Sequence, residues 1–171
     1  MLSTDILVLA ETKLVKSIKN ASFEHRLSNW KILKRCDADS GKKHMGILCL
    51  SPRLNCFKGI SSIAHYTAKR SDSLQIQGVV VKLKSNLSLG FLYCRTSPNN
   101  SEIDYMIKVY GGCDTVMGDF NLSHRIDDHK VKLTKLCQNS KLNVLNFSKM
   151  ENCLFEGSFP SKIYFLSNCC F

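Results

Sequence analysis

The amino-acid sequence predicts a layered domain that mixes strands with a few helices, of the α/β or α+β class. Many short aliphatic runs are bounded by polar or turn residues, and two later segments repeat apolar residues at helical spacing. The chain has 171 residues, of which 44% are hydrophobic and 22% charged. That size and balance predict a single globular domain over residues 1–171 that buries a core of its own.

Six strands are expected in the first half of the chain. Each is a short aliphatic or alternating run that polar residues end. They are expected over Asp5–Ala10, Lys31–Cys36, Met45–Leu50, Ile60–Thr67, Leu74–Leu83 and Leu87–Cys94. The last two are separated by three polar residues, so we expect them to form a β-hairpin.

The next segment predicts a helix that starts near Ser101. Ser101 is a suitable N-cap, and Asp104 lies three residues further on, where it can reach back to the cap. Gly111 and Gly112 are expected to end this helix. The apolar residues that follow helical spacing are Ile103, Met106, Ile107 and Tyr110.

A second helix is expected over Asp128–Asn139. Its apolar side chains are expected to face inward and its lysines mostly outward. The inward set is Leu133, Leu136 and Cys137, and the outward set is Lys130, Lys132 and Lys135. Further short strands are expected over Cys113–Met117, Asn143–Phe147, Cys153–Phe155 and Lys162–Leu166.

The charge balance is strongly basic. Twenty-four lysines and arginines against 14 acidic residues give a net charge of +10. Such a surface favours binding to polyanions, either nucleic acid or an anionic membrane face. The alternative is that the charge only keeps a basic protein soluble. No apolar run reaches the length of a membrane span, and no basic region precedes an apolar stretch as in a signal peptide.

The nine cysteines are expected to be reduced thiols of an intracellular protein, in the nucleus or cytoplasm and not secreted. Their number is odd, no C-x-x-C pair occurs, and their spacing matches no zinc module. We therefore expect no zinc site.

Two carboxylates stand at the ends of apolar strands. Glu11 follows one such run, and Asp119 follows another, with Gly118 before it and Asn121 two residues after it. A strand end is where a rigid sheet presents side chains to a cleft, and carboxylate oxygens are the ligands that Mg²⁺ takes. Taken singly, each has another interpretation: a solvated strand end for Glu11 and an ordinary β-turn for the residues after Gly118.

These residues belong to an ordered set of motifs: Glu11-Thr12, Gly46-Ile47-Leu48, Tyr93 shortly before Pro98, and Gly118-Asp119-Phe120-Asn121. In this order and spacing they resemble the endonuclease/exonuclease/phosphatase superfamily, and within it the apurinic-type endonuclease domains of non-LTR retrotransposons. The resemblance spans most of residues 1–166. It implies a DNase I-like, four-layer α/β/β/α sandwich of the α+β class.

The resemblance also implies roles for individual residues. Glu11 would bind Mg²⁺, or Mn²⁺ in its place, and Tyr93 would lie by the scissile phosphate. Asp119 would orient or activate the attacking water, and Asn121 would bind phosphate. DNA would be the partner. From the residues alone, Tyr93 fits a core aromatic better than a site residue.

The sequence departs from the family pattern at both ends. The family's first strand, which carries an asparagine of the metal site, and its final Ser-Asp-His segment have no counterpart here. Tyr164 stands where the aspartate that orients the family's histidine is usual. We expect an incomplete domain with impaired catalysis, because losing a general acid or base typically costs about 10²–10⁴-fold in rate. His124 and His129 are expected on the surface rather than as replacements.

Three functional readings therefore stand. The first is a Mg²⁺-dependent DNA endonuclease of the retrotransposon type, impaired in this chain. The second is a non-catalytic remnant that binds nucleic acid. The third is a phosphatase or phospholipase of the same superfamily. Lys13 and Lys16 follow Glu11 and are expected to flank the same cleft.

Overall fold

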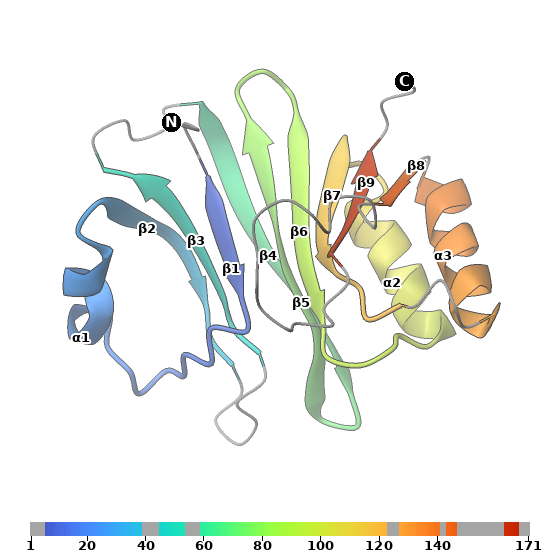
Figure 1. Ribbon diagram of the computed structural model, residues 1–171, viewed down its shortest axis with the longest axis horizontal. Helices are drawn as coiled ribbons and strands as arrows, with labels where there is room; N and C mark the ends of the chain where they lie inside the picture. The colour runs from blue at the N-terminus through green and yellow to red at the C-terminus, as the bar shows by residue number, and fades with distance from the viewer. Residues whose placement is uncertain are drawn as a thin grey trace.

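The protein is built from two β-sheets that face each other, with helices outside them (Figure 1). The computed structural model describes residues 6–38, 45–53, 59–122, 127–140, 143–146 and 163–167, with the backbone alone in the last two ranges. The expected strand over Cys153–Phe155, as well as His124, lies outside the described residues.

The smaller sheet has three antiparallel strands in the order β1-β3-β2. They are β1 (Leu7–Ala10), β2 (Trp30–Cys36) and β3 (Ile47–Pro52). All three follow the aliphatic runs of the sequence closely, because such runs bury well in the interior of a layered fold. Between β1 and β2 the chain makes one turn of helix, α1 (Ala21–Glu24), and a 3₁₀ turn, η1 (His25–Leu27), neither of which the sequence pattern predicted.

The larger sheet has six strands in the order β4-β5-β6-β7-β9-β8. They are β4 (Ile60–Arg70), β5 (Ser73–Leu83), β6 (Ser88–Cys94), β7 (Thr115–Asp119), β8 (Asn143–Asn146) and β9 (Ile163–Ser167). The predicted hairpin of β5 and β6 is confirmed, and β4 adds a second antiparallel pairing on the other side of β5. Among the described strands of this sheet, only β6 and β7 pair in parallel.

Two helices cover the outer face of the larger sheet: α2 (Asn100–Tyr110) and α3 (Asp127–Ser140) (Figure 1). Helix α2 is the crossover between the parallel strands β6 and β7, a connection that a parallel pair requires. From one side to the other the layers are α1, the small sheet, the large sheet, and α2 with α3. The expected four-layer α/β/β/α arrangement of the α+β class is therefore confirmed.

The start of α2 corrects one expectation. Asn99, not Ser101, is the N-cap: its side chain accepts the backbone N–H of Glu102 at 2.9 Å. The Glu102 carboxylate in turn accepts the backbone N–H of Asn99 at 2.8 Å, which completes a capping box. Asn99 wins because its backbone is extended and Glu102 lies three residues on, whereas Ser101 already lies inside the helix. Arg70 of β4 pairs with the buried Glu102 and so ties this helix start to the sheet.

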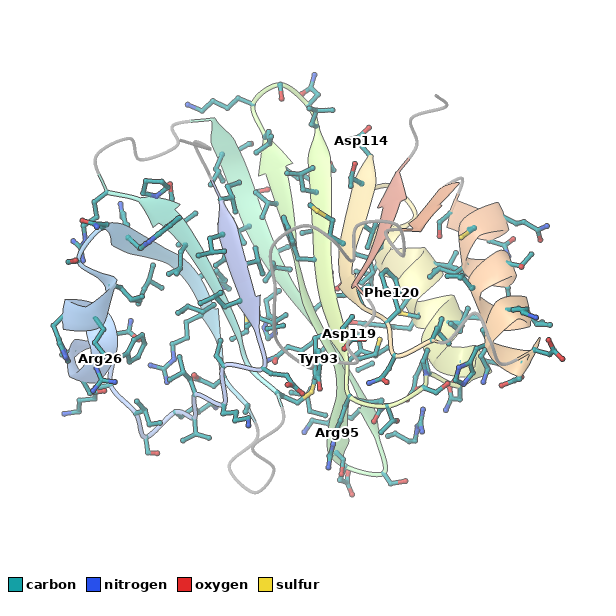
Figure 2. All side chains as sticks on the ribbon, in the orientation of Figure 1. Arg26, Tyr93, Arg95, Asp114, Asp119 and Phe120 are labelled. Atoms are coloured by element: carbon teal, nitrogen blue, oxygen red, sulfur yellow. The ribbon has the colours of Figure 1, made fainter. Side chains whose placement is uncertain are left out.

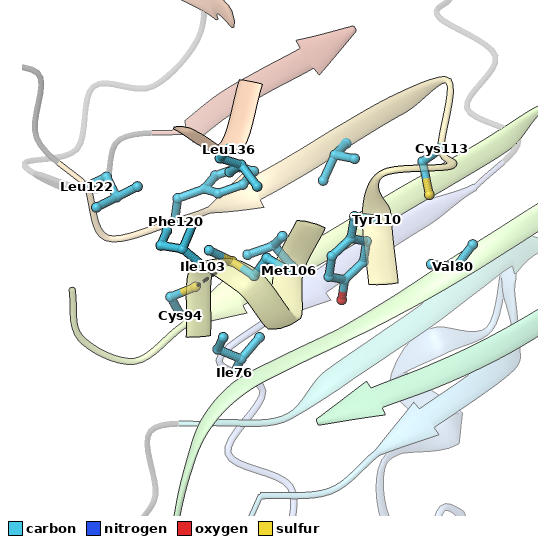
Figure 3. Close-up of a cluster of buried hydrophobic side chains, with 12 residues drawn as sticks. Ile76, Val80, Cys94, Ile103, Met106, Tyr110, Cys113, Phe120, Leu122 and Leu136 are labelled. Carbon is cyan, nitrogen blue, oxygen red and sulfur yellow. Dashed lines mark hydrogen bonds between the residues drawn. The ribbon is translucent and has the colours of Figure 1, made fainter. Parts of the chain in front are cut away.

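The main core lies between the large sheet and helices α2 and α3 (Figure 3). Its buried residues are Ile76, Val80, Leu92, Cys94, Ile103, Met106, Tyr110, Cys113, Val116, Phe120, Leu122 and Leu136. The predicted inward face of α3 is confirmed, because Leu136 is buried and both Leu133 and Cys137 pack against this cluster. The side chain of Tyr110 lies against two strand glycines, because an added Cβ on Gly78 would clash with its hydroxyl and one on Gly90 with its ring. The sheet can therefore carry this large side chain only over glycines.

Smaller apolar clusters join the two sheets. Cys36 and Ile47 of the small sheet pack against Val79 of the large one, and a second cluster joins Met45 to Tyr93. Burial raises the pKa of the Cys49 thiol to about 11 and is the largest cause of the rise at Cys36, to about 12. In the described part of the chain, no disulfide joins Cys36, Cys49, Cys94, Cys113 and Cys137. Such thiols act as small hydrophobic groups rather than nucleophiles.

Candidate active site between the sheets

A pocket of about 380 Å³ opens between the two sheets, at the ends of β1, β6 and β7. Its walls are mostly aliphatic and aromatic, with acidic and phenolic groups at one end. It is lined by Val8, Ala10, Glu11, Ile47, Phe91, Leu92, Tyr93, Met117, Gly118 and Asp119. The two strand-end carboxylates that the sequence singled out, Glu11 and Asp119, thus line the same pocket.

The pairing of neighbouring strands places Tyr93 at the centre of this site. Tyr93 lies opposite Asp119 in the parallel pair of β6 and β7, and opposite Gln77 in the antiparallel pair of β5 and β6. Figure 2 shows Tyr93 and Asp119 close together at the lower end of the large sheet. The Tyr93 hydroxyl donates a hydrogen bond to Oε1 of Glu11, which comes from the small sheet. Tyr93 is thus both a buried aromatic and a member of the site.

Burial and the hydrogen bond to Glu11 raise the pKa of the Tyr93 phenol, so the phenol keeps its proton at neutral pH. Arg95, two residues further on, acts in the opposite direction through its positive charge. It lies beside Tyr93 at the lower end of the sheet (Figure 2). No sequence motif pointed to Arg95, and the available signal was a cation two residues after Tyr93.

Asp119 is half-buried at the end of β7. Burial raises the pKa of its carboxyl, the backbone N–H of Asn121 lowers it by donating to Oδ1 at 2.9 Å, and the negative charge of Glu11 raises it. A cation bound here would offset the unfavourable charge that Glu11 and burial impose on the Asp119 carboxylate. Glu11 is the more exposed of the two.

Gly118 makes the close approach of β7 to β6 possible. Its φ is +144°, and a Cβ at this position would lie 1.8 Å from the carbonyl oxygen of Leu92. Only glycine avoids that contact and adopts that backbone conformation without strain. The glycine before Asp119 is therefore a requirement of the strand pairing that aligns Asp119 with Tyr93.

Asn121 fastens the loop after Asp119 to the end of β6. Its Nδ2 donates to the carbonyl oxygens of Cys94 at 2.9 Å and Arg95 at 3.1 Å, and its backbone has a φ of 50°. The amide donors of Asn121 are thus directed at main-chain carbonyls. The phosphate contact that the resemblance implies for this residue stays a prediction.

The remaining candidates lie around this site in different ways. Lys13 and Lys16 are exposed on the segment that follows Glu11. His129 is not on the open surface as expected: it is half-buried on α3, and its Nε2 lies 2.8 Å from the Ser97 hydroxyl. Among the described residues, no histidine lines the pocket.

The site offers two carboxylates as ligands for a hard divalent cation. Within the described ranges no group of three or more His, Cys, Asp or Glu side chains gathers in one place. Glu11 and Asp119 supply carboxylate oxygens, which suit a cation such as Mg²⁺. Mg²⁺ takes one or two carboxylates, and its remaining ligands are water molecules and phosphate oxygens. These two residues are the ones that could hold such an ion.

No protein-family model matches the chain, and no curated protein matches it. Solved structures do. An AP endonuclease from Leishmania major superposes with a TM-score of 0.63 at 11% identity, over 95% of this chain and 69% of that one. TDP2 from D. rerio, complexed with a single-stranded DNA product, gives 0.54 at 13% identity, over 95% and 70%.

The inositol polyphosphate 5-phosphatase domain of SPsynaptojanin, in complex with inositol (1,4)-bisphosphate and calcium ion, gives a TM-score of 0.52 at 11% identity, over 96% and 67%. All three belong to the endonuclease/exonuclease/phosphatase superfamily. This chain has the DNase I-like fold. The expected resemblance is confirmed at the level of the DNase I-like architecture, which two facing sheets and their outer helices build here.

None of the helices in the described parts of this DNase I-like chain is long and apolar enough to cross a membrane.

Proposed function

We propose that this DNase I-like chain hydrolyses phosphodiester bonds of DNA with the help of a divalent cation, Mg²⁺ or Mn²⁺. One observation carries the proposal: Glu11 and Asp119 line one pocket, and Tyr93 lies opposite Asp119 and donates to Glu11. The fold shared with an AP endonuclease and with DNA-bound TDP2 supports it, as does the net charge of +10. The retrotransposon type of endonuclease rests on the sequence motifs alone.

Each residue has a role that its contacts support. Glu11, and Asp119 beside it, would hold the cation, which when bound neutralises charge that develops on the phosphate. The Asp119 carboxylate would orient the attacking water and accept its proton. Tyr93 fixes the Glu11 carboxylate, and Asn121 holds the loop that carries Asp119.

We also propose that turnover is slow. No histidine lines the pocket within the described residues, so the described site offers no imidazole as general acid for the leaving oxygen. A missing general acid or base costs about 10²–10⁴-fold in rate. This observation favours a second candidate function, a nucleic-acid-binding domain without turnover. We further propose that residues 1–171 form one domain of an intracellular protein, which the described cysteines support because they form no disulfide.

The test is a nicking assay on supercoiled plasmid with Mg²⁺. We expect weak nicking that EDTA and Asp119→Ala abolish, because both remove the cation or its ligand. Asp127→Ala is the matched control, since Asp127 is a surface carboxylate on α3 whose side chain is 93% exposed. Nicking that survives EDTA or Asp119→Ala contradicts the proposed site.

Two further arms separate the alternatives. If DNA binds in a filter or anisotropy assay but no nick forms, the chain is the binding domain of the second candidate. Release of inorganic phosphate from inositol phosphates without DNA nicking would assign it to the phosphatase branch of the superfamily, the third reading of its sequence. Robust nicking, as fast as that of a typical nuclease, would contradict the proposed slow turnover.

A further inference from the structure

Gln77 is a buried polar side chain within the apolar strand β5. It is only 1% exposed. Its Oε1 accepts the backbone N–H of Gly46 at 2.7 Å, and its Nε2 donates to the carbonyl oxygen of Asp37 at 2.9 Å. Asp37 directly follows β2, and Gly46 directly precedes β3. One side chain of the large sheet therefore bridges to two strand ends of the small sheet.

Those strand ends hold the segment that directly follows Glu11. Three successive main-chain hydrogen bonds do so: Thr12 N–H to Gly46 O at 3.1 Å, Lys13 N–H to Met45 O at 2.9 Å, and Ala38 N–H to Leu14 O at 2.7 Å. The first two come from the strand end that Gln77 contacts at Gly46. The third comes from the residue after Asp37, the other contact of Gln77.

The backbone at Glu11 needs such support. Glu11 and Lys13 have φ values of 52° and 57°, the left-handed region that side chains other than glycine rarely adopt. A conformation of this kind persists only where surrounding contacts determine it. The hydrogen bonds of residues 12–14 are those contacts, and they meet at the two groups that Gln77 joins.

We propose that Gln77 is a positioning residue for Glu11: it locks the two strand ends whose main chain holds Glu11 against Tyr93. The side-chain hydrogen bonds of Gln77 go to Gly46 and Asp37, and Gln77 acts through them. The inference rests on the proposed function only in giving Glu11 a catalytic purpose. The positioning itself is a statement about the folded chain.

Glutamine suits this position because one strand end needs a hydrogen-bond acceptor and the other needs a donor. Gly46 presents a donor and Asp37 an acceptor, and a neutral carboxamide satisfies both at once. Methionine has a similar size but offers neither group, so Gln77→Met leaves both main-chain groups buried without a partner. Glutamate can still accept from Gly46 but has no donor for Asp37.

Gln75 provides a matched control. It lies two residues earlier on β5 and is also buried, at 4% exposed. Its Nε2 donates to the backbone oxygen of Thr96 at 3.2 Å and to the Thr96 hydroxyl. Thr96 lies two residues after the end of β6. Gln75→Met therefore removes the same kind of buried amide from the same strand without touching the strand ends that hold residues 12–14.

The experiment measures amide hydrogen exchange of the full chain, residue by residue. In Gln77→Met we expect the amides of Thr12, Lys13 and Gly46 to exchange about tenfold faster, since a lost buried hydrogen bond frees this segment. The amides that pair β5 with β6 should stay as protected as in the unmodified chain. In Gln75→Met, Thr12 and Lys13 should be unchanged.

The opposite results overturn the proposal. Unchanged exchange at Thr12 and Lys13 in Gln77→Met would show that Gln77 does not hold this segment. An equal rise at all amides, or the same rise in Gln75→Met, would show only a loss of global stability. If Gln77→Met does not fold, Gln77→Glu decides: Ala38 should lose more protection than Thr12, and equal loss at both contradicts the proposal.

Catalysis is a separate arm. If the unmodified chain nicks plasmid, Gln77→Met should lower kcat about tenfold or more with little change in KM, because Glu11 is misplaced while the DNA-binding surface is intact. A rise in KM with kcat unchanged would contradict positioning. If the unmodified chain does not nick, the proposed function fails, and the exchange measurements still test Gln77 by themselves.

Discussion

Asp119 and Glu11 put two negative charges at one end of a mostly apolar pocket, and the surroundings of Asp119 set how readily it ionises. Burial and the charge of Glu11 raise its pKa, while the N–H of Asn121 partly opposes them. An apolar wall and a second carboxylate make ionisation costly, and a cation is what offsets that cost. The pH dependence of stability reports this balance without any assay of activity.

Asp119→Asn tests it. The folded chain keeps the Asp119 proton to higher pH than the unfolded chain, whose aspartates have the ordinary value of 3.8. As the pH rises from about 4 through the raised folded pKa, the unmodified chain therefore loses stability that the variant does not lose. The carboxamide oxygen of the variant can still accept the N–H of Asn121. Urea unfolding at pH 4 and pH 7 measures the free energy of unfolding of the unmodified chain and of Asp119→Asn. If the two chains differ by the same amount at both pH values, the raised pKa of Asp119 is contradicted.

Gly118→Ala tests the close contact of β7 with β6. The positive φ alone costs about 1–3 kcal/mol for a residue with a Cβ, and the clash with the Leu92 carbonyl adds to it. We expect a loss of at least about 2 kcal/mol in the free energy of unfolding. Gly112→Ala is the control, because nothing lies within 4 Å of a Cβ there. Equal stability of the two variants would show that β7 can move away from β6.

At the scale of the element, α2 shows how a cap and a crossover position the site. The helix lies between β6 and β7, so its start lies just after Tyr93 and its end just before the strand of Asp119. The capping box of Asn99 and Glu102, with Arg70 on Glu102, anchors that start to the sheet. A shift of α2 would move both strands that carry the large-sheet part of the site.

Asn99→Ala should destabilise the chain by about 1 kcal/mol, the usual effect of a lost N-cap. Ser101→Ala should change stability by less than about 0.5 kcal/mol, because Ser101 is exposed and already inside the helix. Urea unfolding of both variants measures this. A larger effect of Ser101→Ala than of Asn99→Ala would restore the cap that the sequence pattern indicated.

At the scale of the whole molecule, the net charge of +10 governs encounters with polyanions. Lys13 and Lys16 are exposed on the segment that directly follows Glu11, one of the residues that line the pocket. Helix α2 carries its exposed Lys108 on the outer layer, away from the space between the sheets. Charge near the pocket and charge far from it can therefore be separated by mutation.

DNA affinity should fall steeply with salt. Four phosphate contacts would lower the association constant by about 10²-fold between 50 and 200 mM salt, through counterion release. Changing Lys13 and Lys16 together to Gln should flatten the salt slope by about two contacts, whereas Lys108→Gln should leave it unchanged. Fluorescence anisotropy at several salt concentrations measures the slope. An affinity that hardly changes with salt contradicts a phosphate-binding surface.

Local patterns in the sequence were enough to locate most elements. The aliphatic and alternating runs predicted β1 to β7 to within a few residues, because a strand that buries one or both faces shows its burial in its own sequence. Helix α2 followed from apolar residues at helical spacing, and the error at its cap arose because Ser101 and Asn99 are both good capping residues. Only the backbone conformation at Asn99 distinguishes them.

The sequence by itself thus determined the class of fold, the basic charge and the two strand-end carboxylates. The tertiary structure alone decided that Tyr93 aligns with Asp119 and Gln77, that Tyr93 donates to Glu11, and that Gln77 bridges the two sheets. The physical reason is the separation along the chain of the residues that interact. A run of apolar residues reports its own burial, whereas strand order, register and the contact between sheets depend on residues far apart in the chain.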